Sequence, residues 1–206
     1  MLRLSLKLAV IFVCFSGSTA WGAGLPGQCQ SNCVSSYGEV LGKSPAGVAA
    51  YSNCNSSCVV FEPAKYEGTY TGIKWQCVEY ARRWLLVNEG VVYGDVDVAA
   101  DIWNKIEHVS TVPGKKAIKL VNFVNGSTTM PARGDLLVYA REYLNTGHVA
   151  VVTAVDVKQG FIKVAEQNFL NSRWPGDFAR KIKYVHSEGS FWLMDPYLLG
   201  WKRIQR

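Results

Sequence analysis

The chain has 206 residues, of which 49% are hydrophobic and 18% charged, and its 22 Lys and Arg exceed its 16 Asp and Glu. This composition excludes a disordered chain and is typical of one globular domain with a small addition. The net charge of +6 is spread over scattered basic pairs that are expected on solvated faces, so no nucleic-acid partner is expected.

Residues 1–20 have the pattern of a cleaved signal peptide. Arg3 and Lys7 precede a short apolar run at residues 8–15, and small residues lead up to a cleavage point after Ala20. A membrane anchor would need roughly 20 apolar residues. We therefore expect a secreted or periplasmic protein without a transmembrane segment in its mature chain, which would carry a net charge of about +4.

Four cysteines form a twin Cys-x3-Cys pattern within residues 21–61. In an exported protein such thiols are expected to form disulfides, and a zinc site is the alternative. A spacing of four places both thiols of a pair on one helical face, and a turn-forming segment lies between the pairs. The prediction is a small disulfide-stapled helical hairpin, whose geometry favours Cys29–Cys58 and Cys33–Cys54 among three possible connectivities.

Cys77 is the cysteine that this pattern leaves without a partner. From about Gln76 to Asn88 the sequence predicts a helix, with an apolar stripe that includes Cys77, Tyr80 and Trp84. In the first turn of a helix, free backbone N–H groups and the helix dipole favour a thiolate and can bind an oxyanion. The alternative is a small buried hydrophobic residue with no chemical role.

A thiolate nucleophile needs a base, and His148 is the best placed of three histidines. His108 is expected at the C-terminal end of a helix-like segment, residues 99–107, and His186 in a solvated loop. His148 opens an apolar, β-branched run at residues 148–155 that predicts a core strand. In that position it is either a hydrogen-bonded structural residue or a positioned base.

A second strand is expected at residues 161–169, joined to the first by a tight turn. With a loop of three or five residues, His148 lies opposite Asn168 and diagonal to Glu166. A buried carboxylate is costly unless it is paired, and Glu166 would be paired if it held one imidazole nitrogen while the other faced Cys77. This order of nucleophile, base and orienting carboxylate predicts a thiol hydrolase. A register slip of one residue would place Glu166 on the wrong face.

Four segments carry a resemblance to a known family: residues 74–84 (KWQCVEYARRW), 131–135 (PARGD), 147–151 (GHVAV) and 165–169 (AEQNF). In this order they resemble the CHAP family of cysteine- and histidine-dependent amidohydrolases and peptidases. Within that family they are most similar to the amidase domains of glutathionylspermidine and trypanothione synthetases. The resemblance implies an α+β, papain-like fold over residues 62–206, in which the helix with the cysteine packs on an antiparallel sheet.

The resemblance also implies roles for single residues. Cys77 would be the nucleophile, His148 the general base and acid, and Glu166 the residue that orients His148. Gln76 and Asn168 would support the imidazole or contact the substrate. No cofactor and no metal ion are implied.

The sequence therefore predicts an exported, monomeric, thiol-dependent amidohydrolase or peptidase. Two substrate classes stay open. Export favours amide bonds in peptidoglycan peptides, whereas the motifs favour glutathionylspermidine-like conjugates of γ-glutamyl peptides with polyamines. A prediction of another class is a non-catalytic secreted binding module that keeps the fold. Because the hairpin directly precedes the strand that leads to Cys77, we expect it to pack near the cleft.

Overall fold

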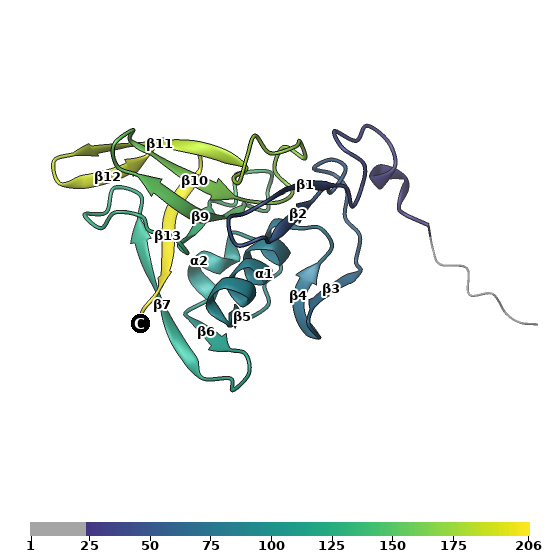
Figure 1. Cartoon of the computed structure of the whole chain (residues 1–206), viewed down its shortest axis with the longest axis horizontal. Helices are drawn as coiled ribbons and strands as arrows, with labels where there is room; N and C mark the ends of the chain where they lie inside the picture. The colour runs from purple at the N-terminus through teal and green to yellow at the C-terminus, as the bar shows by residue number, and fades with distance from the viewer. Residues whose placement is uncertain (1–23) are drawn as a thin grey trace, which may run out of the picture.

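The structure is a computed structural model that describes residues 24–206, so the predicted signal peptide at residues 1–20 lies outside the described residues. Figure 1 shows a large sheet with the helices beside it and two small hairpins at the far side of the longer helix. Within the described range, no helix is both long enough and apolar enough to cross a membrane.

A nine-stranded sheet forms the body of the protein. From one edge to the other, its strands are β12 (Ser190–Leu193), β11 (Arg180–Ser187), β10 (Phe161–Ala165), β9 (Val149–Asp156), β8 (Leu136–Tyr139), β13 (Leu198–Ile204), β7 (Ala117–Val124), β6 (His108–Thr111) and β5 (Val91–Tyr93). All neighbouring strands are antiparallel. A mixed fold with few helices and a large antiparallel sheet agrees with the expected α+β class.

The predicted central helix is present as α1 (Cys77–Glu89). Its N-cap, Gln76, has extended backbone angles, and the helix ends at Gly90, whose φ of 64° lies in the left-handed region that glycine tolerates. The second helix, α2 (Asp101–Lys105), is shorter than the segment expected to be helical. His108 therefore begins β6 instead of ending a helix.

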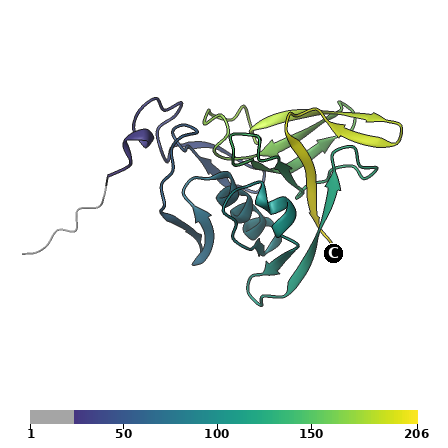
Figure 2. The same cartoon turned by 180° about the vertical axis from the view of Figure 1, so that it is seen from behind.

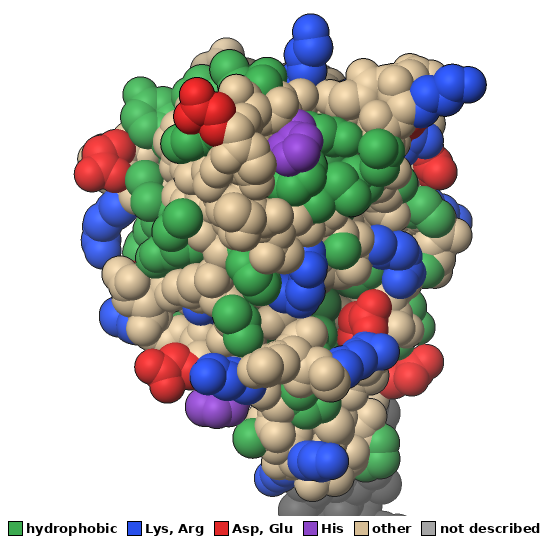
Figure 3. Space-filling view, turned by 90° about the vertical axis from the view of Figure 1, so that its left-hand side faces the viewer, with side chains coloured by type: hydrophobic (Ala, Val, Ile, Leu, Met, Phe, Trp, Pro, Cys, Tyr) green, Lys and Arg blue, Asp and Glu red, His purple; other side chains and the backbone are tan. Residues whose placement is uncertain are grey.

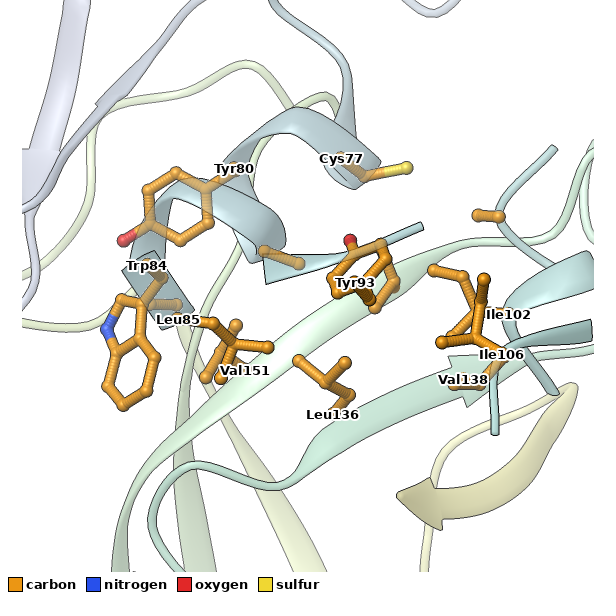
Figure 4. Packing of buried hydrophobic residues seen from close by; sticks show 14 of the residues in the cluster. Cys77, Tyr80, Trp84, Leu85, Tyr93, Ile102, Ile106, Leu136, Val138 and Val151 are labelled. Carbon is orange, nitrogen blue, oxygen red and sulfur yellow. The ribbon is translucent and has the colours of Figure 1, made fainter. Parts of the chain in front are cut away.

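The apolar stripe of α1 covers one face of the sheet. Tyr80 and Trp84 are at most 1% exposed and belong to the same hydrophobic cluster as Leu136 of β8, as Figure 4 shows. The next residue, Leu137, points to the other face and joins a second cluster around Trp201. This alternation follows from the period of two along a strand. Both faces of β8 are therefore covered, and the central strands of the sheet are buried beneath α1.

Residues 24–61 do not form the helical hairpin that the cysteine spacing predicted. They contain one 3-10 turn, η1 (Gly27–Cys29), and a pair of short antiparallel strands, β1 (Val40–Lys43) and β2 (Ala49–Tyr51). The segment is rich in Ser, Gly and Asn, which disfavour a helix interior and favour turns. A spacing of four residues can bring thiols together in such turns as well as on a helix.

Two disulfides hold this segment together. Cys29 is joined to Cys58 and Cys33 to Cys54, with Cα atoms 4.8 and 4.2 Å apart. These are the pairs that a hairpin favours, although the backbone between them consists of turns and strands. Leu41 lies in the main core cluster with α1, so the segment packs on the rest of the domain.

A further hairpin leads into α1, formed by β3 (Pro63–Tyr66) and β4 (Thr69–Ile73). Figures 1 and 2 place it with the β1–β2 hairpin beside α1, at the end of the molecule opposite β11 and β12. Figure 3 shows that opposite end, where acidic and basic side chains are interspersed with hydrophobic ones. His186, expected in a solvated loop, is exposed on β11 and stacks on Phe191 with ring centroids 4.2 Å apart.

Candidate active site

The structure brings four of the five predicted site residues to one cavity at the start of α1. Gln76, Cys77, His148 and Asn168 line this cleft, whose volume is about 450 Å³. That volume is typical of small-molecule sites, which span about 300 to 1,000 Å³. Glu166 lies behind His148, outside the cleft, where it contacts the far side of the imidazole.

Cys77 is the first residue of α1, and Figure 4 shows its sulfur directed away from the hydrophobic cluster. The side chain is 8% exposed. Burial alone would raise the pKa of this thiol. The charge of His148, a hydrogen bond from the imidazole, and backbone N–H groups of Val149 and Val78 outweigh burial and lower the pKa below its ordinary value. These contacts favour a thiolate at the helix start.

His148 stands between the thiol and a carboxylate. Its Nε2 lies 2.9 Å from Oε2 of Glu166, which leaves Nδ1 for the hydrogen bond with Cys77. Burial opposes the charged imidazolium, yet the negative charges of Cys77 and Glu166 raise the pKa of His148 to about 9. The opposite shifts of the two pKa values favour a thiolate–imidazolium pair.

The pairing of β9 with β10 decides whether Glu166 can reach His148. The prediction assumed a loop of three or five residues, but the turn at residues 157–160 has four. The first pair, Phe161 with Asp156, is therefore displaced by one residue from the predicted register. An irregularity between Lys163 and Val164 then shifts the pairing by one residue, as a β-bulge does. The shift returns Glu166 to the face that carries His148.

Asn168 and Gln76 contact each other rather than the imidazole. β10 ends at Ala165, before the predicted end at residue 169, and Asn168 adopts a left-handed backbone with φ of 54°. Its Nδ2 donates a 2.7 Å hydrogen bond to Oε1 of Gln76, whose Nε2 donates to the carbonyl of Cys58 at 3.3 Å. The disulfide-bonded N-terminal segment, residues 24–61, is thus linked through Cys58 to the residue that precedes Cys77.

Sequence reasoning missed the cation that holds Glu166. Arg180, at the start of β11, donates from Nε to Glu166 at 2.6 Å and from a terminal nitrogen to Asp195 at 2.7 Å. The Tyr139 hydroxyl also donates to Asp195, at 2.6 Å. Burial would raise the pKa of Glu166, but His148 and Arg180 lower it below its ordinary value. The only signal in the sequence was the need of a buried carboxylate for a cation.

A second buried network joins α1 to the residue after Glu166. Glu79 is fully buried and accepts hydrogen bonds from Arg83 at 2.7 Å, Thr71 at 2.9 Å and Gln167 at 3.1 Å. Gln167 also donates to the carbonyl of Gln76 at 3.1 Å. The i, i+4 spacing of Glu79 and Arg83 could have indicated this ion pair.

The mouth of the cleft is apolar and acidic. Phe61, which is 85% exposed, and Tyr70 lie on its rim. Because Phe61 belongs to residues 24–61, the N-terminal segment lies near the cleft, where it was expected. Asp95 and Asp97 also line the cleft. Asp95 contacts Arg82 at 3.0 Å, and the Asp97 side chain, which is 94% exposed, lies 3.9 Å from the ammonium group of Lys105. Among residues 24–206, no three His, Cys, Asp or Glu side chains are placed to hold a metal ion.

A thiol and an imidazole side by side in a cleft, with a carboxylate bonded to the far side of the imidazole, define a candidate hydrolase site. The sequence model of the CHAP domain matches residues 66–168. The chain therefore belongs to the CHAP-domain family, and the matched region contains all five predicted site residues.

Two characterised proteins are similar in sequence to this chain over most of its length. The chain is 36% identical over 183 residues to the bifunctional glutathionylspermidine synthetase/amidase of Escherichia coli (strain K12), an alignment covering 80% of this chain and 29% of that protein. It is 32% identical over 160 residues to the trypanothione synthetase of Crithidia fasciculata, an alignment that covers 77% of this chain and 24% of that protein. The chain spans less than a third of the length of these relatives. The CHAP domain and the amidase relatives support a hydrolase that acts on amide bonds.

Proposed function

We propose that this protein is an exported, thiol-dependent amidohydrolase in which Cys77, His148 and Glu166 act as nucleophile, base and orienting carboxylate. The observation that carries the proposal is the buried group of Cys77, His148 and Glu166 at the edge of the cleft, in which His148 bonds to Glu166 and Cys77 and His148 shift each other's pKa in opposite directions. Opposite shifts of the two pKa values prepare the thiolate without a separate activation step.

The reaction follows from the placement of these groups. The Cys77 thiolate attacks the carbonyl carbon of the amide, and backbone N–H groups at the start of α1 stabilise the oxyanion. The imidazolium of His148 donates its proton to the leaving amine, and a thioester forms on Cys77. Water then gives a proton to His148 and attacks the thioester, which releases the acid and restores the thiolate.

The cleft favours a substrate with a positive charge near the scissile amide. Asp95 and Asp97 line the cleft with side chains that are 69% and 94% exposed, and each also pairs with a cation, Arg82 and Lys105 respectively. Phe61 and Tyr70 offer apolar contacts. Opposite charge at the mouth of a cleft attracts substrate and fixes its orientation. Peptides of peptidoglycan that contain a diamino acid and conjugates that contain a polyamine both meet this requirement.

Export would bring the enzyme to the compartment that contains peptidoglycan, so our first candidate substrate is a wall peptide, cleaved at an amide bond. The two disulfides are compatible with that compartment. A glutathionylspermidine-like conjugate is the second candidate, because the relative from Escherichia coli is named for an amidase of that compound.

Incubation of residues 21–206 with purified sacculi and, separately, with glutathionylspermidine tests both substrates. Mass spectrometry should detect a new amine from one of them, and the variant Cys77→Ala should release none. Full activity of Cys77→Ala would refute the mechanism. Release from neither substrate by a protein whose Cys77 is rapidly alkylated by iodoacetamide would refute both substrates. Binding of a wall peptide without turnover would favour a non-catalytic module.

A further inference from the structure

A second cavity lies on the other side of the segment that leads to Cys77. It is formed between the β1–β2 and β3–β4 hairpins and α1, and it measures about 450 Å³. Figures 1 and 2 show both hairpins beside α1 on the side away from β11 and β12. Lys74 and Trp75 line this second groove, whereas Ile73, Gln76 and Cys77 line the cleft. The two hollows are therefore separated by one short stretch of chain.

All charged side chains that line the second groove are basic. They are Lys43, Lys65, Lys74 and Arg83, and no Asp or Glu is among its lining residues, which all lie in the described part of the chain. Arg83 is neutralised by buried Glu79, and Lys74 pairs with Glu62. Lys43 and Lys65 are exposed and form no ion pair with any of residues 24–206. Two unpaired positive charges thus face the groove, one from each hairpin.

Aromatic rings line the same groove. Tyr51 and Trp75 have ring centroids 4.2 Å apart with an interplanar angle of 32°, and both side chains are partly exposed. Tyr66, on β3, is 36% exposed and also lines the groove. Aromatic faces are rigid apolar surfaces that pack on the C–H groups of a sugar ring at low entropic cost. The groove therefore combines a surface for a ring with charges for an anion.

We propose that this groove binds an acidic sugar chain whose rings carry carboxylate groups. The two unpaired lysines are compact point charges that can each pair with a separate carboxylate, whereas bidentate recognition of a phosphate group favours an Arg fork. The groove's one arginine is already bound by Glu79. A single-stranded nucleic acid fits less well, because proteins bind it in a basic groove that follows its backbone past successive stacking rings, whereas this groove offers two unpaired lysines. The site is independent of the proposed amide hydrolysis.

Isothermal titration of residues 21–206 with tetragalacturonate tests the proposal. The matched pair of variants is Lys43→Ala/Lys65→Ala, in the groove, and Lys115→Ala/Lys116→Ala, which removes two exposed lysines elsewhere. We expect the first to weaken binding about tenfold at low salt and the second less than twofold. Circular dichroism checks that both variants fold, and neither variant should change amide hydrolysis.

Further titrations use ligands that differ in one property. The methyl ester of tetragalacturonate keeps the sugar rings and removes the charges, so it should bind at least tenfold more weakly. Equal binding of the ester, or equal loss in the two double variants, would overturn the proposal. Tighter binding of a short single-stranded oligonucleotide than of tetragalacturonate would overturn it as well. Absence of any tetragalacturonate binding would also overturn the proposal of a sugar-binding groove, and it would leave the proposed enzyme activity unaffected.

Discussion

The substitution Glu166→Gln removes one charge from the buried series and leaves a side chain of the same shape. Glu166 is 3% exposed, and its two oxygens accept hydrogen bonds from His148 and Arg180. In the variant, an amide oxygen can still accept from His148, but an amide N–H then meets the guanidinium of Arg180. The main expected effect is weaker stabilisation of the imidazolium of His148.

The size of this effect follows from the short distance and from burial. Glu166 Oε2 lies 2.9 Å from His148 Nε2, and both side chains are 2% exposed, so solvent screens the pair little. A neighbouring opposite charge shifts a pKa by about 1 to 3 pH units. Because the hydrogen bond survives, we expect the pKa of His148 to fall from about 9 by about 1 to 2 pH units. This corresponds to about 1.4 to 2.7 kcal/mol less stabilisation of the imidazolium.

The sign of the pH effect is set by the protonation state that the mechanism needs. Activity requires a thiolate and an imidazolium, so it is present above the pKa of Cys77 and is lost above that of His148. Glu166→Gln lowers the upper limit. The alkaline limb of kcat/KM should therefore move to lower pH by about 1 to 2 pH units, and the acid limb should change less.

NMR titration of the imidazole signals measures the pKa of His148 without a substrate. The exposed His108 and His186 lie away from the substituted side chain, and their imidazole signals serve as internal references. The matched control is Asp195→Asn, since Asp195 contacts Arg180 but not His148. An unchanged His148 midpoint in Glu166→Gln, or an equal change in the control, would refute the reasoning.

Three further predictions concern the stability of the fold. Gly147→Ala should lower the free energy of unfolding by about 1 to 3 kcal/mol, because its Cβ would lie 2.6 Å from the backbone oxygen of Tyr139 and its backbone would keep a φ of 69°. Because residue 147 precedes His148, the substitution should also slow turnover. Urea unfolding measures the first effect and kcat/KM the second. Removing the Cys33–Cys54 disulfide should cost about 2 to 4 kcal/mol in the same unfolding assay. Burial lowers the pKa of Lys202 to about 8, so the unfolded state binds more protons above that pH. Stability should then rise with pH from about 8 towards 10.5, and less so in Lys202→Met.

The features that could be predicted from sequence are those with a local signal. The period of α1 and the place of Cys77 at its start follow from residue spacing alone. The apolar run after His148 is the buried strand β9. The cysteine spacing led to the disulfide pairs but to the wrong backbone, because a distance of four residues is compatible with turns as well as with a helix.

The features that could not be predicted depend on pairing between distant segments. Arg180 meets Glu166 because β11 pairs with β10, and no spacing in the sequence encodes that contact. The bulge between Lys163 and Val164 gives no sequence signal either, although the position of Glu166 depends on it. The side to which Glu166 points was therefore the feature of the site that the sequence determined least.

Three consecutive residues connect the separate parts of the site, and this explains why β10 ends where it does. Glu166 contacts His148, Gln167 contacts Glu79 in α1, and Asn168 contacts Gln76. In a regular strand, neighbouring side chains point to opposite faces, so three successive residues could not all reach partners around one helix start. Residues 166–168 lie beyond the end of β10, and Asn168 has a left-handed backbone, so the alternation does not continue through them. Ending the strand at residue 165 is thus what allows one short segment to orient the imidazole and hold the start of α1 together.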